Sequence, residues 1–151
     1  MIDAKKIKEL RDQTGLSFGH CKQALEEAGG DLTKAVELLR AKGESVAGKK
    51  ADRALGAGTV AVYLHNGGQI GAMLLLRSET DFVAKNAEFK ALAEDLAMQV
   101  AATAPESLET FLAEPFIKNP DSTVSEMVKS AVHKFGERIE VGQFSRLDAQ
   151  V

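Results

Sequence analysis

The chain has 151 residues, of which 44% are hydrophobic and 27% charged, a composition typical of a folded soluble protein. Its 19 basic and 22 acidic side chains give a formal charge of -3, which argues against a non-specific nucleic-acid binder because such proteins carry a basic surplus. A single cysteine excludes an intramolecular disulfide and fits a reducing cytoplasm, and no apolar run approaches the roughly 20 residues of a membrane span, so we expect a soluble cytoplasmic protein.

Three short helices are predicted at the N-terminus. Asp3, Ser17 and Asp31 can each cap one of them, because their side-chain oxygens accept hydrogen bonds from free backbone N–H groups. Apolar positions recur at helical spacing and a glycine follows each helix: Ile7 and Leu10, then Phe18, Cys21, Leu25 and Ala28, then Leu32, Ala35, Val36 and Leu39, with Gly15, Gly29 and Gly43 beyond the ends. We expect residues 1–43 to form a docking domain, since about 40 residues leave no room for a deep active site.

A change of period marks a second domain. Residues 44–58 are basic and end in Gly-Ala-Gly, so they are predicted to be a short exposed helix or linker. From Thr59 the apolar residues alternate, and Asn66-Gly67 separates two such runs, which is the strongest short hairpin signal. The second run, residues 70–76, is apolar on both faces, so we expect it at the centre of a sheet covered by helices.

The rest of the chain adds helices and a last strand. Residues 86–102 return to helical spacing, and a short helix or turn followed by an irregular connection is expected over 106–121. The Thr123–Glu126 capping box opens a further helix, which Gly136 ends. Residues 138–147 are predicted to be a strand with a bulge at Gly142. The expected fold of residues 59–151 is therefore α+β, with a three-stranded antiparallel sheet.

The sequence offers few groups for catalysis. The three histidines, His20, His65 and His133, lie in separate elements without metal-ligand spacing, so a zinc site is not expected. Cys21 lies on the apolar face of its helix and is interpreted as a small core residue. Carboxylates such as Glu79 and Asp81 are on exposed elements, where they are usually solvated. No catalytic constellation can be assembled, and we expect neither a metal ion nor a cofactor.

The stretch Ser78–Asn86, "SETDFVAKN", places Phe82 directly after Asp81 where the chain is expected to turn at the surface. Two interpretations are open. Phe82 could fold back onto its own domain as a helix staple, since Phe89 begins an apolar stripe soon after it. Alternatively it is an exposed apolar anchor for a partner, with Asp81 giving direction, because aromatic anchors dominate interface energetics.

Two long segments resemble the elongation factor Ts family of translation factors. They are "TDFVAKN" with the "EFKALAEDLAMQVAA" that follows, and the N-terminal "IKELRDQTGLSFGHCKQALEEAGGDLTKAVELLRAKG", which is similar to that family's ubiquitin-associated-like three-helix domain. "EPFIKNPDSTVSEMV" and "GERIEVGQFSRL" resemble its C-terminal stretch. The chain departs from the family at Phe18-Gly19-His20, where apolar residues and an Asp are common. It also resembles a short form that lacks the second core subdomain and the coiled-coil insertion.

The resemblance implies a function without a catalytic centre. It implies guanine nucleotide exchange on elongation factor Tu, bound in its GDP-bound and nucleotide-free states, with Thr80, Asp81, Phe82 and Val83 disturbing the magnesium site of that GTPase. It also implies that the N-terminal domain docks through Arg11 and Phe18.

A homodimer is expected through residues 60–76 and the last strand, because the sheet has few covering elements. The rival functions are an adaptor module without exchange activity and a small enzyme.

Overall fold

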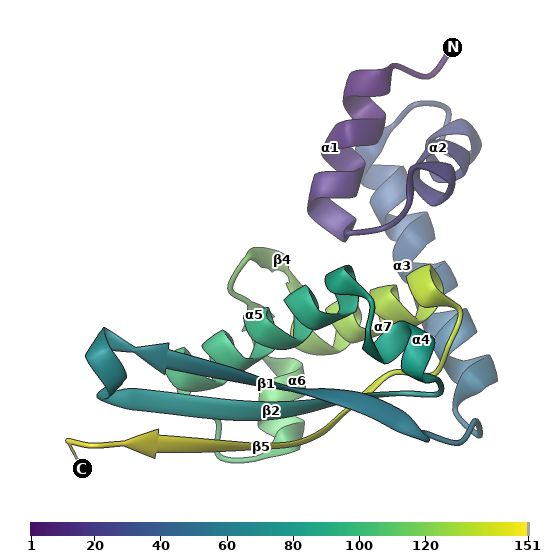
Figure 1. Ribbon diagram of the computed structural model, residues 1–151. Helices are drawn as coiled ribbons and strands as arrows, with labels where there is room; N and C mark the ends of the chain where they lie inside the picture. The colour runs from purple at the N-terminus through teal and green to yellow at the C-terminus, as the bar shows by residue number, and fades with distance from the viewer. Residues whose placement is uncertain (151) are drawn as a thin grey trace.

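The computed structural model describes residues 1–150 and shows N-terminal helices followed by a mixed unit of sheet and helices (Figure 1). The elements are α1 Ala4–Thr14, α2 Phe18–Glu27, α3 Leu32–Lys50, β1 Ala57–His65, a 3₁₀ turn Asn66–Gly68, β2 Ile70–Ser78, α4 Asp81–Ala84, α5 Ala87–Thr103, α6 Leu108–Ala113, β3 Pro115–Phe116, β4 Asn119–Thr123, α7 Val124–Phe135 and β5 Glu140–Asp148. The predicted α+β class, with helices before a three-stranded antiparallel sheet, is confirmed.

Side-chain caps start the three N-terminal helices as predicted. Asp3, Ser17 and Asp31 accept hydrogen bonds from the first-turn backbone N–H groups of α1, α2 and α3. The helices enclose a small apolar core of their own, made by Ile7, Leu10, Leu16, Cys21, Ala24, Leu25, Ala35 and Leu39.

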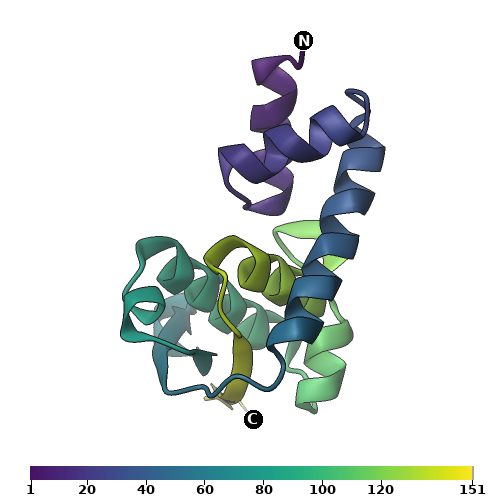
Figure 2. The ribbon, with the colours of Figure 1, turned by 90° about the vertical axis from the view of Figure 1, so that its right-hand side faces the viewer.

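Helix α3 is longer than the sequence predicted. It does not end at Gly43 but continues to Lys50, so that it runs from the N-terminal helices down the side of the second unit (Figure 2). Gly43 faces α7, since a β-carbon there would lie 3.5 Å from the carbonyl oxygen of Lys129, an ordinary van der Waals distance. One turn later Val46 and Ala47 pack against the larger core. The tertiary contact with α7 therefore overrides the glycine as a stop signal.

The sheet has the order β1-β2-β5, with β2 central and both pairs antiparallel. The turn at Asn66–Gly68 joins β1 to β2, and Gly67 takes the left-handed conformation that this turn requires, with φ 68°. Leu75 pairs with Gln143 and Leu76 with Val141, which leaves Gly142 as the extra residue of a bulge. The hairpin, the central strand and the bulge are confirmed.

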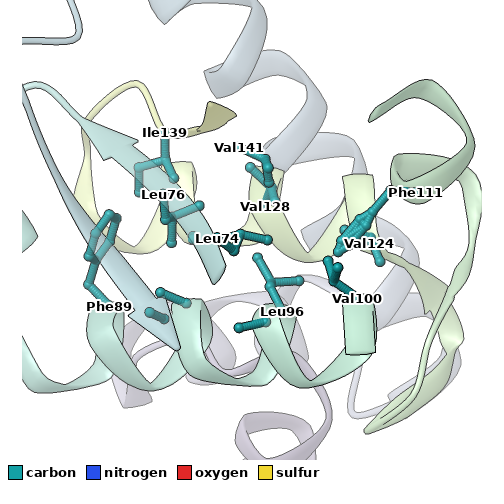
Figure 3. Packing of buried hydrophobic residues seen from close by; sticks show 14 of the residues in the cluster. Leu74, Leu76, Phe89, Leu96, Val100, Phe111, Val124, Val128, Ile139 and Val141 are labelled. Carbon is teal, nitrogen blue, oxygen red and sulfur yellow. The ribbon is translucent and has the colours of Figure 1, made fainter. Parts of the chain in front are cut away.

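The two faces of the sheet differ. Helix α5 covers one face, and Figure 3 shows Leu96 and Val100 of this helix facing Leu74 of β2. The other face is open to solvent although it is apolar. We call it the open sheet face, and its exposed large side chains are Val60, Val62, Leu64, Met73 and Leu147.

A small hairpin, β3–β4, lies where an irregular connection was expected. The buried side chain of Gln99 on α5 holds it. Its amide nitrogen donates to the carbonyl oxygen of Pro115 at 3.0 Å and to Glu114 at 3.1 Å, and its amide oxygen accepts from the backbone N–H of Ile117 at 3.0 Å. Because all of these are contacts between segments distant in sequence, the local pattern did not reveal them.

Candidate partner-binding site

The stretch that follows β2 forms a one-turn helix rather than the expected loop. Thr80 is the N-cap residue of α4, which spans Asp81–Ala84. Asn86 then caps α5 by accepting hydrogen bonds from the backbone N–H groups of Glu88 and Phe89. Two helix starts within seven residues turn the chain sharply from the sheet into the helix that covers it.

The side chains of α4 divide between core and solvent. Val83 and Ala84 are buried in the larger core, whereas Thr80, Asp81 and Phe82 are exposed. The ring of Phe82 is 92% exposed. The staple interpretation is therefore wrong for this chain, because the aromatic ring that packs inside is that of Phe89, at 0% exposure. A large apolar side chain in water beside a carboxylate is what a partner-binding anchor requires.

A segment far from α4 in sequence forms hydrogen bonds with the residues at its start. Glu137, in the turn between α7 and β5, accepts hydrogen bonds from the backbone N–H groups of Glu79 and Thr80 and from the Thr80 hydroxyl. In return, the backbone N–H of Arg138 donates to the Glu79 carboxylate at 3.2 Å. Sequence reasoning missed Glu137, because its partners lie 57 and 58 residues earlier and no local motif marks it.

The N-terminal candidates flank the turn between α1 and α2. Arg11 is exposed in the last turn of α1, and Phe18 is 53% exposed at the first position of α2. The apolar spacing had placed Phe18 on the same face of the helix as Cys21 and Leu25. In the structure the third buried residue of α2 in the small core is Ala24 and not Phe18.

The α1–α2 turn contacts α7, which in turn connects it to the start of α5. The ammonium group of Lys134 donates to the carbonyl oxygen of Gly15 at 2.6 Å and also forms an ion pair with Glu88. In Figure 2 the N-terminal helices accordingly lie above the segment that contains α4 and the start of α5. The structure thus connects the two candidate regions through α7, although they are far apart in sequence.

The remaining reactive side chains do not converge on a site. Cys21 is buried, and burial raises the pKa of its thiol, which makes it a poor nucleophile. The rings of His20 and His133 lie in contact with their centroids 4.3 Å apart and their planes tilted by 33°, a contact between α2 and α7 that the sequence did not predict. Burial lowers the pKa of His133, and the neighbouring His20 and Lys42 lower it further. Residues 1–150 contain no group of three or more His, Cys, Asp or Glu side chains that could hold a metal ion.

No helix within residues 1–150 combines the length and the apolar character that a membrane crossing demands.

Comparison with known proteins identifies relatives over nearly the whole chain. The family model described as "Elongation factor TS" matches residues 79–151. Elongation factor Ts of Carboxydothermus hydrogenoformans is 39% identical, with 98% of this chain and 89% of that protein covered. Elongation factor Ts of Desulforamulus reducens is 37% identical over 97% of this chain and 88% of that protein. Elongation factor Ts of a Nostoc species is 44% identical over 95% of this chain but only 45% of that protein.

These relatives are longer than the chain. The match to the Carboxydothermus protein extends over 193 aligned positions, which exceeds the 151 residues of the chain by 42. That protein therefore contains segments that have no counterpart here, in agreement with the short form that the sequence indicated.

Proposed function

The chain belongs to the elongation factor Ts family, and we propose that it promotes the release of GDP from elongation factor Tu during translation elongation. The observation that carries this proposal is the exposed ring of Phe82 on a helical turn whose next two residues are buried. A side chain in that position has no role in its own core and is available to a partner.

Exchange of this kind requires binding and no covalent chemistry. A GTPase holds its nucleotide through phosphate contacts and a bridging magnesium ion. A protein that binds the nucleotide-free GTPase more tightly must weaken nucleotide affinity by the same factor, because coupling between two ligands is reciprocal. A chain without convergent catalytic groups can therefore perform this function, and no cofactor of its own is needed.

In the proposed mechanism, Phe82 enters a pocket of the GTPase domain near the magnesium site. The ring displaces packed side chains there and disturbs the groups that hold the water shell of the ion. With the ion lost, the GDP phosphates are less well neutralised, and GDP leaves faster. Asp81 directs the approach of the ring, while Thr80 and the buried Val83 fix the shape of the turn.

The N-terminal helices supply a second contact in this proposal. Residues 1–43 dock on the GTPase through the exposed Arg11 and Phe18, residues 44–58 link them to the rest, and residues 59–151 form the core and dimerisation domain. The ion pair and hydrogen bond of Lys134 support this arrangement, since they fix the α1–α2 turn relative to α5. Two contacts held at a constant separation bind more tightly than either contact does alone.

A second copy of the chain is the proposed cover of the open sheet face. Val60, Val62, Leu64, Met73 and Leu147 are all more than half exposed, and contiguous apolar surface of this kind marks interaction sites. A two-fold axis would bring the same patch of both copies together.

The test is the release of a fluorescent GDP analogue from elongation factor Tu, followed with and without this protein at fixed magnesium concentration. A substoichiometric amount should accelerate release, because each copy is recycled. Binding to elongation factor Tu without acceleration would overturn the proposal and favour an adaptor module.

A further inference from the structure

We propose that Glu137 is a positioning residue for exchange: it grips the start of α4 and thereby fixes the direction in which Phe82 is presented. The inference rests on the proposed function of Phe82 and adds a residue that lies outside the stretch Thr80–Val83. Glu137 belongs to the turn between α7 and β5, and its side chain reaches back across 57 residues to Thr80.

The contacts of Glu137 are concentrated on the residues just before α4. Its Oε1 atom accepts from the backbone N–H of Thr80 at 3.0 Å and from that of Glu79 at 3.2 Å. Its Oε2 atom accepts from the Thr80 hydroxyl at 2.6 Å. One carboxylate thus receives three hydrogen bonds from two neighbouring residues, and bonds to an ionised acceptor are stronger than those between neutral groups.

The Thr80 hydroxyl is used in an unusual way. Thr80 is the N-cap residue of α4, a position where a threonine hydroxyl ordinarily accepts from the backbone of its own helix. Here the hydroxyl is directed to Glu137 rather than to the α4 backbone. The hydroxyl of the capping residue therefore forms its hydrogen bond with a residue from another part of the chain.

Helix α4 needs such an anchor because it is very short. A helix of one turn is unstable by itself, since nucleation fixes several backbone angles for very few hydrogen bonds. Val83 and Ala84 hold one side of α4 in the core, but the ring of Phe82 has little packing of its own. The direction of the ring is consequently set by the backbone at Thr80, which is the point that Glu137 grips.

Glu137 is itself held in place. The backbone N–H of the adjacent Arg138 donates to Glu79 Oε2 at 3.2 Å, which makes the connection between the two segments reciprocal. Arg138 also donates through its guanidinium to the carbonyl oxygen of Arg53 at 2.7 Å. The grip on α4 is therefore part of a network rather than a single flexible contact.

The experiment compares full-length Glu137→Ala and Glu137→Gln with Glu109→Ala in stimulated GDP release. Glu109 is a matched control, because it is an exposed carboxylate on α6, outside the network of Glu137, Glu79 and Arg138. We expect Glu137→Ala to slow release about fivefold, the factor that one net hydrogen bond provides. Glu137→Gln should recover part of the rate, since its amide oxygen still accepts from the two backbone N–H groups. Glu109→Ala should be close to the unaltered protein.

A double-mutant cycle separates positioning from general destabilisation. If Glu137 acts through Phe82, then Glu137→Ala should slow release little further in a chain that already carries Phe82→Ala. Losses that multiply in the double variant would overturn the proposal, as would an unchanged rate for Glu137→Ala.

Hydrogen exchange of the protein alone gives a readout that does not depend on the GTPase. The amides of Glu79 and Thr80 should lose protection in Glu137→Ala, while amides in the middle of β2 and α5 keep theirs. Unchanged protection at both positions would overturn the grip, and Glu137→Asp, whose carboxylate is one methylene further from both amides, serves if the alanine variant fails to fold. If Glu137→Ala loses this protection but the unaltered protein does not stimulate GDP release, the proposed function is overturned, whereas the hydrogen bonds of Glu137 to the start of α4 are supported.

Discussion

Replacing Phe82 with alanine should separate folding from exchange. The ring is 92% exposed, so its removal takes almost no apolar surface out of the core. Surface substitutions of this kind usually change the free energy of unfolding by no more than about 0.5 kcal/mol. Phe82→Ala should therefore unfold at nearly the same denaturant concentration as the unaltered protein.

The effect on exchange should be much larger. Burying a Phe side chain in a partner contributes roughly 1.5 to 3 kcal/mol. Each 1.36 kcal/mol changes a rate about tenfold, so the loss of the ring should slow stimulated GDP release roughly 10- to 150-fold. The loss should be clearest with magnesium present, because the ring is proposed to act by disturbing the magnesium site.

Stopped-flow fluorescence of labelled GDP on elongation factor Tu measures this rate over a range of magnesium concentrations. Ile117→Ala is the matched control, since Ile117 is also an exposed apolar residue but lies between β3 and β4. The reasoning is refuted if Phe82→Ala remains folded and stimulates release at the unaltered rate. It is equally refuted if the variant unfolds while the rate per folded molecule stays the same, because Phe82 would then act in stability.

Three further predictions concern the N-terminal helices, assembly and pH. Arg11→Ala and Phe18→Ala should each weaken binding to elongation factor Tu several-fold in calorimetry without unfolding the protein, and unchanged affinity for both would remove the docking role. Light scattering at micromolar concentration should give about twice the chain mass of 16.2 kDa, and Val62→Asp should give the single mass, because a charge cannot be buried unpaired between two apolar faces. Burial and the neighbouring His20 lower the pKa of His133 below its ordinary 6.5. As the pH falls, the unfolded state therefore binds a proton at this histidine before the folded state does, so the free energy of unfolding should be full above about pH 6.5 and decline below it. Denaturant unfolding should show a smaller decline in His133→Gln, and equal declines in the two proteins would contradict the assignment.

Features that depend on neighbouring residues could be predicted from the sequence. The Thr123–Glu126 capping box is present because both of its hydrogen bonds join residues three apart. The turn at Asn66-Gly67 likewise follows from the left-handed conformation that Gly67 adopts, with φ 68°. Phe82 could also be recognised as unusual from its neighbours, since an aromatic residue directly after an acidic one in a predicted turn is conspicuous without any knowledge of the fold.

Features that depend on distant residues could not be predicted. Helix α3 passes through Gly43 because α7 lies against that glycine, and only the folded chain brings the two together. The ring contact between His20 and His133 and the hydrogen bonds of Glu137 to Thr80 arise in the same way. The sequence therefore marked Phe82 as a candidate anchor, one of the two interpretations that it left open, whereas the contact of Glu137 with Thr80 required the structure.

A fixed orientation of Phe82 before binding should lower the entropy cost of binding a partner. A flexible side chain or loop loses conformational freedom when it is buried in a partner, at about 0.5 to 1.5 kcal/mol for each side chain that is immobilised. In α4 much of this ordering is already present before binding, because Val83 and Ala84 are buried in the core and Thr80 is bonded to Glu137. In the proposed mechanism, more of the free energy gained by burying Phe82 is then available to distort the partner. A rigid turn with one exposed ring is thus better suited to force a change in another protein than a flexible loop would be.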